Sequence, residues 1–123
     1  MSKAMVVDDS RAVRMILARI LRGVGYEVCE ASDGKEALAK LAEAGAVSLI
    51  LVDWNMPNVD GLEFVRSLRS NPANADVKVM MVTTETEMDR MVTALEAGAN
   101  EYVMKPFTAD IISDKLRLLG VLQ

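Results

Sequence analysis

Five short apolar segments alternate with segments of helical periodicity, and this alternation constrains the fold more than any other feature of the chain. Three apolar segments are continuous: Met5-Val6-Val7, Leu49-Ile50-Leu51-Val52 and Val79-Met80-Met81-Val82. Continuous runs of this length are typical of strands buried on both faces of a parallel sheet. The segment 27–30 alternates instead, which favours an edge strand. The predicted strands are residues 3–7, 27–31, 48–52, 77–82 and 101–104.

Between the predicted strands, apolar residues recur with the spacing of helices that bury one face. In the segment 87–97, the residues expected to form the buried stripe are Met88, Met91, Val92 and Leu95. In the segment 11–22, four arginines lie opposite the apolar stripe and are expected to form a solvent-exposed face; they are Arg11, Arg14, Arg19 and Arg22. The predicted helices are residues 11–22, 33–44, 61–70, 87–97 and 109–119.

Residues at the helix ends support these boundaries. Ser10, Ser32 and Thr108 stand where N-caps belong, and a glycine follows three of the predicted helices. Five repeats of strand and helix imply an α/β fold, a doubly wound parallel sheet with helices on both faces. We expect one domain that covers residues 1–123, because this length suffices for a single core.

Composition excludes several classes of function. The 123 residues include one cysteine and no histidine, which argues against a disulfide framework, a zinc site and a phosphohistidine carrier. The net charge of −4 argues against nucleic-acid binding, since neutralising phosphates requires a basic face. No apolar run approaches the length of a membrane span and no signal peptide is evident. We therefore expect a cytoplasmic protein without membrane insertion.

Polar side chains stand where four of the predicted strands end. Asp8 and Asp9 follow the first strand, Asp53 the third, Thr83 the fourth and Lys105 the fifth. Ligands of open parallel sheets bind at this edge. Each residue alone fits an ordinary structural role, such as a helix cap or a turn, but their joint occurrence at one edge indicates a functional site.

The three carboxylates at this edge need a cation. At an effective dielectric constant near 20, two carboxylates 4–5 Å apart repel each other by about 3–4 kcal/mol. Lys105 supplies one positive charge and a divalent ion the rest, and carboxylate oxygens with room for water favour Mg²⁺. A carboxylate beside Mg²⁺ and a lysine is the arrangement expected of an aspartyl-phosphate nucleophile. Thr83 is placed to hydrogen-bond a phosphoryl oxygen.

The sequence resembles two-component receiver domains along its whole length. The motifs that carry the resemblance are Val7-Asp8-Asp9-Ser10-Arg11, Asp53 to Gly61, Thr83-Thr84-Glu85 and Lys105-Pro106-Phe107. The resemblance implies a flavodoxin-like fold of five strand–helix repeats with the strand order 2-1-3-4-5. Within the family, the Asp53–Gly61 stretch, Tyr102 and the residues after Lys105 are most similar to the chemotaxis regulators.

The resemblance also implies roles for the site residues. Asp53 would be phosphorylated by a phosphohistidine of a sensor histidine kinase. Asp8, Asp9, Asp53 and the backbone carbonyl of Asn55 would hold Mg²⁺. Lys105 would pair with the phosphoryl group, and its peptide bond to the following proline is expected to be cis.

Further residues would transmit and time the signal. Thr83 would move toward the phosphate, and Tyr102 would turn inward into the vacated space. The side chains of Asn55 and Glu85 would tune the lifetime of the acyl phosphate. Thr84 departs from the chemotaxis pattern, which usually has alanine there, and its extra bulk is expected to restrict access to the phosphorylated aspartate.

The last predicted helix suggests a surface for a protein partner. Ile111 and Leu118 lie at the edge of its apolar arc and are expected to be exposed beside Tyr102, with Lys115 inside the arc. The resemblance places partner binding on this face. The most favoured partner is a flagellar motor switch protein, bound by a monomeric receiver that has no output domain.

Two other functions compete with this chemotaxis switch. A single-domain receiver in another pathway, such as a phosphorelay shuttle or a phosphate sink, would use the same site. A Mg²⁺-dependent aspartyl-phosphate hydrolase is less favoured, because Asn55 stands where such enzymes typically carry an acid two residues after the nucleophile. We expect no enzymatic activity beyond the protein's own phosphorylation and dephosphorylation.

Overall fold

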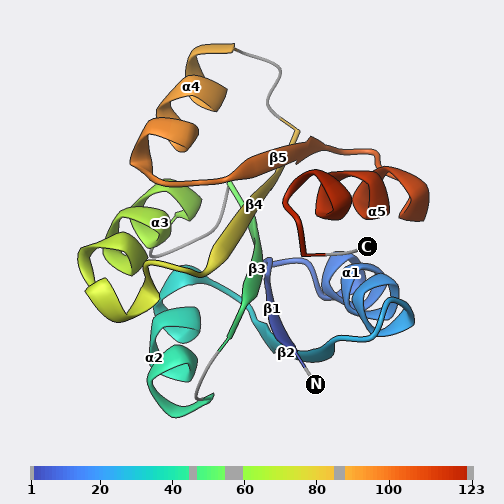
Figure 1. The fold of residues 1–123 in the computed structure, drawn as a ribbon, viewed down its shortest axis with the longest axis horizontal. Helices are drawn as coiled ribbons and strands as arrows, with labels where there is room; N and C mark the ends of the chain where they lie inside the picture. Colours follow the sequence, from blue (N-terminus) through green and yellow to red (C-terminus); the bar gives the residue numbers. More distant parts are fainter. Residues whose placement is uncertain (1, 45–46, 55–59, 85–87, 122–123) are drawn as a thin grey trace.

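The chain folds into a five-stranded parallel sheet with the strand order β2-β1-β3-β4-β5, which confirms the predicted doubly wound fold. The computed structural model describes residues 2–44, 47–54, 60–84 and 88–121. Helices α1 and α5 cover one face of the sheet, and α2, α3 and α4 cover the other (Figure 1). The elements are β1 (Lys3–Val7), α1 (Arg11–Gly23), β2 (Glu27–Ala31), α2 (Gly34–Ala44), β3 (Leu49–Asp53), α3 (Gly61–Ser70), the 3₁₀ turn η1 (Pro72–Asn74), β4 (Lys78–Thr83), α4 (Met88–Ala97), β5 (Glu101–Met104) and α5 (Ala109–Leu118).

Continuous apolar strands produce two separate hydrophobic layers, because successive side chains point to opposite faces of the sheet. In β1, Met5 and Val7 pack in the layer under α2, α3 and α4, whereas Ala4 and Val6 pack in the layer under α1 and α5. Every residue of β3 is buried, as expected for a central strand. The edge strand β2 is only partly buried, in agreement with its alternating sequence.

The end of β3 and the end of β4 each lie one residue beyond the prediction. Consequently Asp53 and Thr83 are the last residues of their strands and pair in register with their neighbours rather than belonging to the following loops. Sheet hydrogen bonding therefore fixes the backbone of both residues. Among the described residues, no helix combines the length and apolar character needed to cross a membrane.

Helix α4 corrects one sequence prediction. Met91 is buried as expected, but Val92 and Leu95 are 44% and 43% exposed, and the second buried residue is Ala94. The helix places its small residue Ala94 in the layer under α2, α3 and α4, where a larger side chain would need more room. Hydrophobicity alone favoured the larger residues. The side chain of Met88, the fourth residue of the predicted stripe, lies outside the described residues.

The caps confirm two of the three predicted N-cap residues. The hydroxyls of Ser10 and Thr108 accept hydrogen bonds from the backbone N–H groups of Val13 and Ile111. The prediction for Ser32 is wrong, because Asp33 caps α2 by accepting from the backbone N–H of Glu36 at 2.8 Å. Ser32 instead donates its hydroxyl to the Glu36 carboxylate, and this contact lowers the pKa of Glu36.

Candidate functional site

The polar residues predicted at the strand ends converge at one edge of the sheet. Asp8 follows β1, Asp53 ends β3, Thr83 ends β4, and Lys105 follows β5. One carboxylate oxygen from each of Asp8, Asp9 and Asp53 lies within 4.8 Å of the other two. Thr83 is buried beside them in the sheet, and its carbonyl accepts a hydrogen bond from the Lys105 backbone N–H at 2.8 Å. The fold thus brings together the residues that the sequence proposed.

Asp8 is fully buried and held from several sides. Its Oδ1 accepts a hydrogen bond from the Ser10 backbone N–H at 2.8 Å, and its Oδ2 lies 3.3 Å from Lys105 Nζ. Its own backbone N–H donates to the Ala31 carbonyl of the neighbouring strand. A buried carboxylate with these partners is a rigid part of the site, and it presents its charge to whatever binds beside it.

Asp53 is 6% exposed, and Lys105 Nζ lies 3.4 Å from its Oδ1. Burial and the nearby Asp8 carboxylate raise the pKa of Asp53 to about 6, although Lys105 opposes this shift. One ammonium group therefore does not fully offset the combined effect of burial and the neighbouring carboxylate. The site stores unfavourable electrostatic energy that a bound cation would relieve.

Asp9 differs from the other two acids because it is exposed. Two buried carboxylates and one solvent-facing carboxylate form a cluster that is open on one side. Hard oxygen ligands around an excess of negative charge suit Mg²⁺, which retains waters and prefers carboxylates. The residues present therefore fit this ion. Asn55, whose backbone carbonyl was the fourth predicted ligand, lies outside the described residues, as does Glu85.

The peptide bond between Lys105 and Pro106 is cis, as the resemblance implied. Thr84, one residue beyond β4, is exposed.

Tyr102 of β5 is partly buried against the hydrophobic layer under α2, α3 and α4. The ammonium of Lys115 lies 4.9 Å from the centre of the Tyr102 ring and 3.2 Å from the Glu101 carboxylate. The Lys115 ammonium of α5, paired with the Glu101 carboxylate, therefore lies over the Tyr102 ring.

The predicted partner surface is exposed in part. On α5, Ile111 is 42% and Leu118 is 74% exposed, as expected from the sequence. Helices α4 and α5 flank β5 (Figure 1), and α4 contributes the exposed Val92 and Leu95. The described parts of α4 and α5 thus carry four exposed apolar side chains, and Lys115 of α5 lies over Tyr102 of β5 between the two helices.

One residue beside the site was assigned wrongly from the sequence. Arg14 was expected on a solvent-exposed face, but its side chain is only 16% exposed. Its Nη1 donates to the backbone carbonyl of Asp8 at 2.6 Å, and its Nε lies 3.3 Å from the Glu30 carboxylate of β2. Helical periodicity cannot distinguish an arginine over a strand end from one in solvent. The acid at the end of a neighbouring predicted strand was the available signal.

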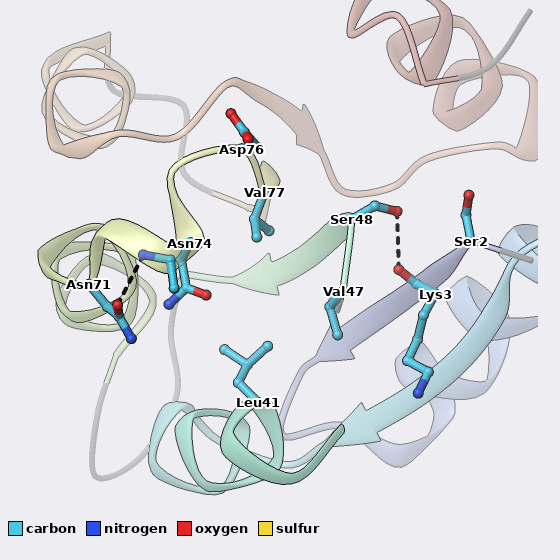
Figure 2. Close-up of a pocket in the computed structure, with 10 residues that line it drawn as sticks. Ser2, Lys3, Leu41, Val47, Ser48, Asn71, Asn74, Asp76 and Val77 are labelled. Carbon is cyan, nitrogen blue, oxygen red and sulfur yellow. Dashed lines mark hydrogen bonds between the residues drawn. The ribbon is translucent and has the colours of Figure 1, made fainter. Parts of the chain in front are cut away.

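A hollow of about 650 Å³ lies away from these residues, at the opposite edge of the sheet. Figure 2 shows it between the C-terminal end of α2, the turn after α3 and the starts of β1 and β3, with Leu41, Val47, Asn71 and Asn74 around it. The Ser48 hydroxyl hydrogen-bonds the Lys3 carbonyl at its rim. Of the predicted site residues that the structure describes, none lines this hollow.

Comparison with known proteins agrees with the fold and the family resemblance. A sequence profile of the response regulator receiver domain matches residues 4–117. The chain is 40% identical to chemotaxis protein CheY1 of Helicobacter pylori over 118 residues, which cover 95% of each chain. It is 41% identical over 115 residues to a chemotaxis protein CheY homolog of Campylobacter jejuni, covering 93% of this chain and 88% of that protein. The structure of CheY4 of Vibrio cholerae aligns with a TM-score of 0.89 at 36% identity, over 96% of this chain and 98% of that one.

The chain therefore belongs to the response regulator receiver family of two-component signalling proteins. The relatives to which it is similar over most of its length are chemotaxis proteins of the CheY type. The family resemblance predicted from the strand-end motifs is confirmed.

Proposed function

We propose that this protein is a phosphorylation-activated switch in which Asp53 accepts a phosphoryl group from a phosphohistidine of a sensor histidine kinase. The observation that carries the proposal is the position of Asp53. It is nearly buried at the end of the central strand, 3.4 Å from Lys105 Nζ and grouped with the carboxylates of Asp8 and Asp9. The protein would act as a monomer and a single receiver domain.

In the proposed transfer, an oxygen of the ionised Asp53 carboxylate attacks phosphorus and the P–N bond to the donor imidazole breaks. The imidazole leaves with the electron pair of that bond and takes a proton from solvent, and an acyl phosphate remains on Asp53. Lys105 would neutralise charge on the transferred phosphoryl oxygens. Thr83, the last residue of the adjacent strand, would donate its hydroxyl to one of them.

Asp8, Asp9 and Asp53 would hold Mg²⁺ together with the backbone carbonyl of Asn55. When bound, the ion supplies positive charge that neutralises the carboxylates and the phosphoryl oxygens. The raised pKa of Asp53 supports this assignment, because ionisation of this carboxyl group is unfavourable in the site and a bound cation would favour the carboxylate, which is the form that attacks. Asn55 and Glu85 would tune the lifetime of the acyl phosphate, and Thr84 would slow access to it.

The output would be binding of a flagellar motor switch protein through Tyr102, Ile111, Lys115 and Leu118. Phosphate on Asp53 adds charge at strong acceptor oxygens and would draw Thr83 toward it. Tyr102 would then turn inward and change the face between α4 and α5. The similarity to CheY chemotaxis proteins supports this pathway over a phosphorelay shuttle or a phosphate sink.

Phosphoramidate and Mg²⁺ test the acceptor directly. We expect the wild type to gain one phosphoryl group by mass spectrometry and to change the fluorescence of Trp54, which is buried next to Asp53. Asp53→Asn should abolish both signals. Asp110→Asn, which removes an exposed acid from the first turn of α5, is the matched control and should retain them. Phosphorylation of the Asp53→Asn variant to the wild-type extent would refute Asp53 as the acceptor.

A further inference from the structure

The exposed carboxylate of the site lies between two fixed peptide groups. Asp9 is joined to Asp8 by one peptide and to Ser10 by the next. The carbonyl of the first peptide accepts a hydrogen bond from Arg14 Nη1 at 2.6 Å, and the N–H of the second donates to Asp8 Oδ1 at 2.8 Å. Both peptide planes that determine where the Asp9 side chain projects are therefore held by side chains.

The side chains that make these two contacts have different relations to the proposed metal site. The contact to Ser10 comes from a residue that would itself bind the metal ion, whereas Arg14 takes no part in the proposed metal site or in phosphoryl transfer. Arg14 lies in the second turn of α1, and the helix is itself anchored by its Ser10 cap. A side chain on a capped helix is thus a rigid support for the Asp8 carbonyl.

Glu30 sets the orientation of the Arg14 side chain. The Glu30 carboxylate lies 3.3 Å from Arg14 Nε, so the guanidinium bridges the end of β2 and the end of β1. The backbone carbonyl of Glu30 also accepts a hydrogen bond from Lys40 of α2. A planar guanidinium held at two of its nitrogens has little freedom to turn, and a lysine ammonium cannot reproduce both contacts.

We infer that Arg14, oriented by Glu30, is a positioning residue that holds the Asp8–Asp9 peptide so that the Asp9 carboxylate faces Asp8 and Asp53 for metal binding. This inference rests on the proposed Mg²⁺ site. It makes a counter-intuitive prediction, because Arg14 is a cation near a cation site. Loss of its charge alone would strengthen Mg²⁺ binding, whereas loss of the positioning contact weakens it.

The test is a calorimetric titration of the folded protein with Mg²⁺ alone. We expect Arg14→Met to weaken Mg²⁺ binding about tenfold, at the lower end of the range seen when supporting contacts of metal ligands are removed. Arg14→Lys should remain weakened although the charge is kept, and Glu30→Gln should weaken binding less than Arg14→Met. Arg19→Met removes the same charge from an exposed position of the same helix and should leave the affinity within about twofold of wild type.

A double variant of Asp9 and Arg14 distinguishes the positioning of Asp9 by Arg14 from a general effect of Arg14 on folding. In an Asp9→Asn background, adding Arg14→Met should cause no further loss of Mg²⁺ affinity, because the ligand that Arg14 positions is already gone. If Arg14→Met is too unstable to study, Arg14→Lys and Glu30→Gln provide the same comparison.

Two results would overturn the inference while leaving the proposed function intact. One is wild-type or tighter Mg²⁺ binding by Arg14→Met, and the other is a full additional loss in the Asp9→Asn background. A wild-type protein that binds no Mg²⁺, or whose binding is unaffected by Asp9→Asn, would overturn the proposed metal site and this inference together.

Discussion

Asp53 shows how the demands of the site oppose the stability of the fold. A carboxyl group at the end of a fully buried strand is costly to ionise, and the neighbouring Asp8 increases that cost. Its pKa rises to about 6 despite Lys105, so the folded protein without metal binds a proton there more tightly than the unfolded chain does. Stability is therefore lost as the pH rises from about 4 through 6, where the folded state must give up that proton.

The raised pKa of Asp53 leads to the first prediction. Asn cannot ionise, so Asp53→Asn should raise the free energy of unfolding at about pH 7.5 in EDTA by roughly 2–3 kcal/mol. The difference should shrink as the pH falls below 6 and vanish below about pH 3, where Asp53 is protonated in both states. Urea unfolding at a series of pH values measures it. A variant less stable than wild type at pH 7.5 would contradict the prediction.

Magnesium provides the matching control for that experiment. Saturating Mg²⁺ should stabilise the wild type, because a ligand that binds only the folded state adds to its stability. The Asp53→Asn variant lacks one of the three grouped carboxylates and should gain less. At pH 7.5, replacing EDTA with Mg²⁺ should therefore reduce the stability advantage of Asp53→Asn over the wild type.

At the scale of elements, the start of α3 packs closely against the end of β3. A Cβ added at Gly61, the first residue of α3, would lie 2.5 Å from the backbone carbonyl of Asp53 and 3.0 Å from Trp54 Cα. Contacts this short with backbone cannot be relieved by a side-chain rotation. Glycine at this position therefore lets the helix begin directly behind the proposed phosphorylation site.

The second prediction follows from that close approach. Gly61→Ala should destabilise the protein by about 2 kcal/mol or more and change the emission of Trp54, because the end of β3 must shift. Gly23→Ala is the matched control at the last residue of α1, where an added Cβ meets nothing within 4 Å. It should leave the emission unchanged and alter stability by no more than about 1 kcal/mol. Equal effects of the two substitutions would show that the contact at Gly61 is unimportant.

The elements also show which information the sequence carries. Strands β1, β3 and β4 were predictable because short, continuous apolar runs bounded by polar residues are typical of central strands, and the strand ends then placed Asp8, Asp53 and Thr83 at one edge. The buried face of α4 was not predictable from hydrophobicity, since the helix packs through Ala94 and leaves Leu95 exposed. Close packing by small residues depends on the shape of the partner surface, which the local sequence does not describe.

Polar contacts between distant elements were missed for a related reason. Arg69 of α3 donates to the backbone carbonyls of Gly98, Asn74 and Val77 and to the side chain of Asn100, and so ties the start of β4 to the turn before β5. Burial lowers the pKa of its guanidinium. Like Arg14, it looks in the sequence like one more solvent-exposed charge on an amphipathic helix. Such roles become visible only when the packing of the helix on the sheet is known.

At the scale of the whole molecule, the fold separates chemistry from output. The acid cluster lies at the carboxyl ends of the strands, whereas α4 and α5, which carry the exposed apolar residues, flank β5 (Figure 1). Strand β5 connects the two regions, since it carries Tyr102 and is followed by Lys105. A change at Asp53 can therefore reach the outer face through one edge strand, and disturbing that face need not disturb the site.

This separation gives the third prediction. Ile111→Ala together with Leu118→Ala should weaken binding of the phosphorylated protein to a flagellar motor switch protein about tenfold, since both side chains are largely exposed and offer apolar area to a partner. The same double variant should bind Mg²⁺ and accept phosphate from phosphoramidate as the wild type does. Its stability should fall by less than about 1 kcal/mol, because exposed side chains contribute little to the core.

The control for this prediction lies on a different helix. Met15 and Ile16 on α1 are about as exposed as Ile111, so truncating both to alanine removes similar apolar area from a helix outside the α4–β5–α5 face. That variant should retain wild-type affinity for the motor switch protein when the binding of both double variants is measured by surface plasmon resonance. If both double variants weaken binding equally, the partner does not recognise the α4–β5–α5 face. If neither does, the exposed apolar residues of α5 serve no role in this interaction, and a phosphorelay or phosphate-sink function gains support.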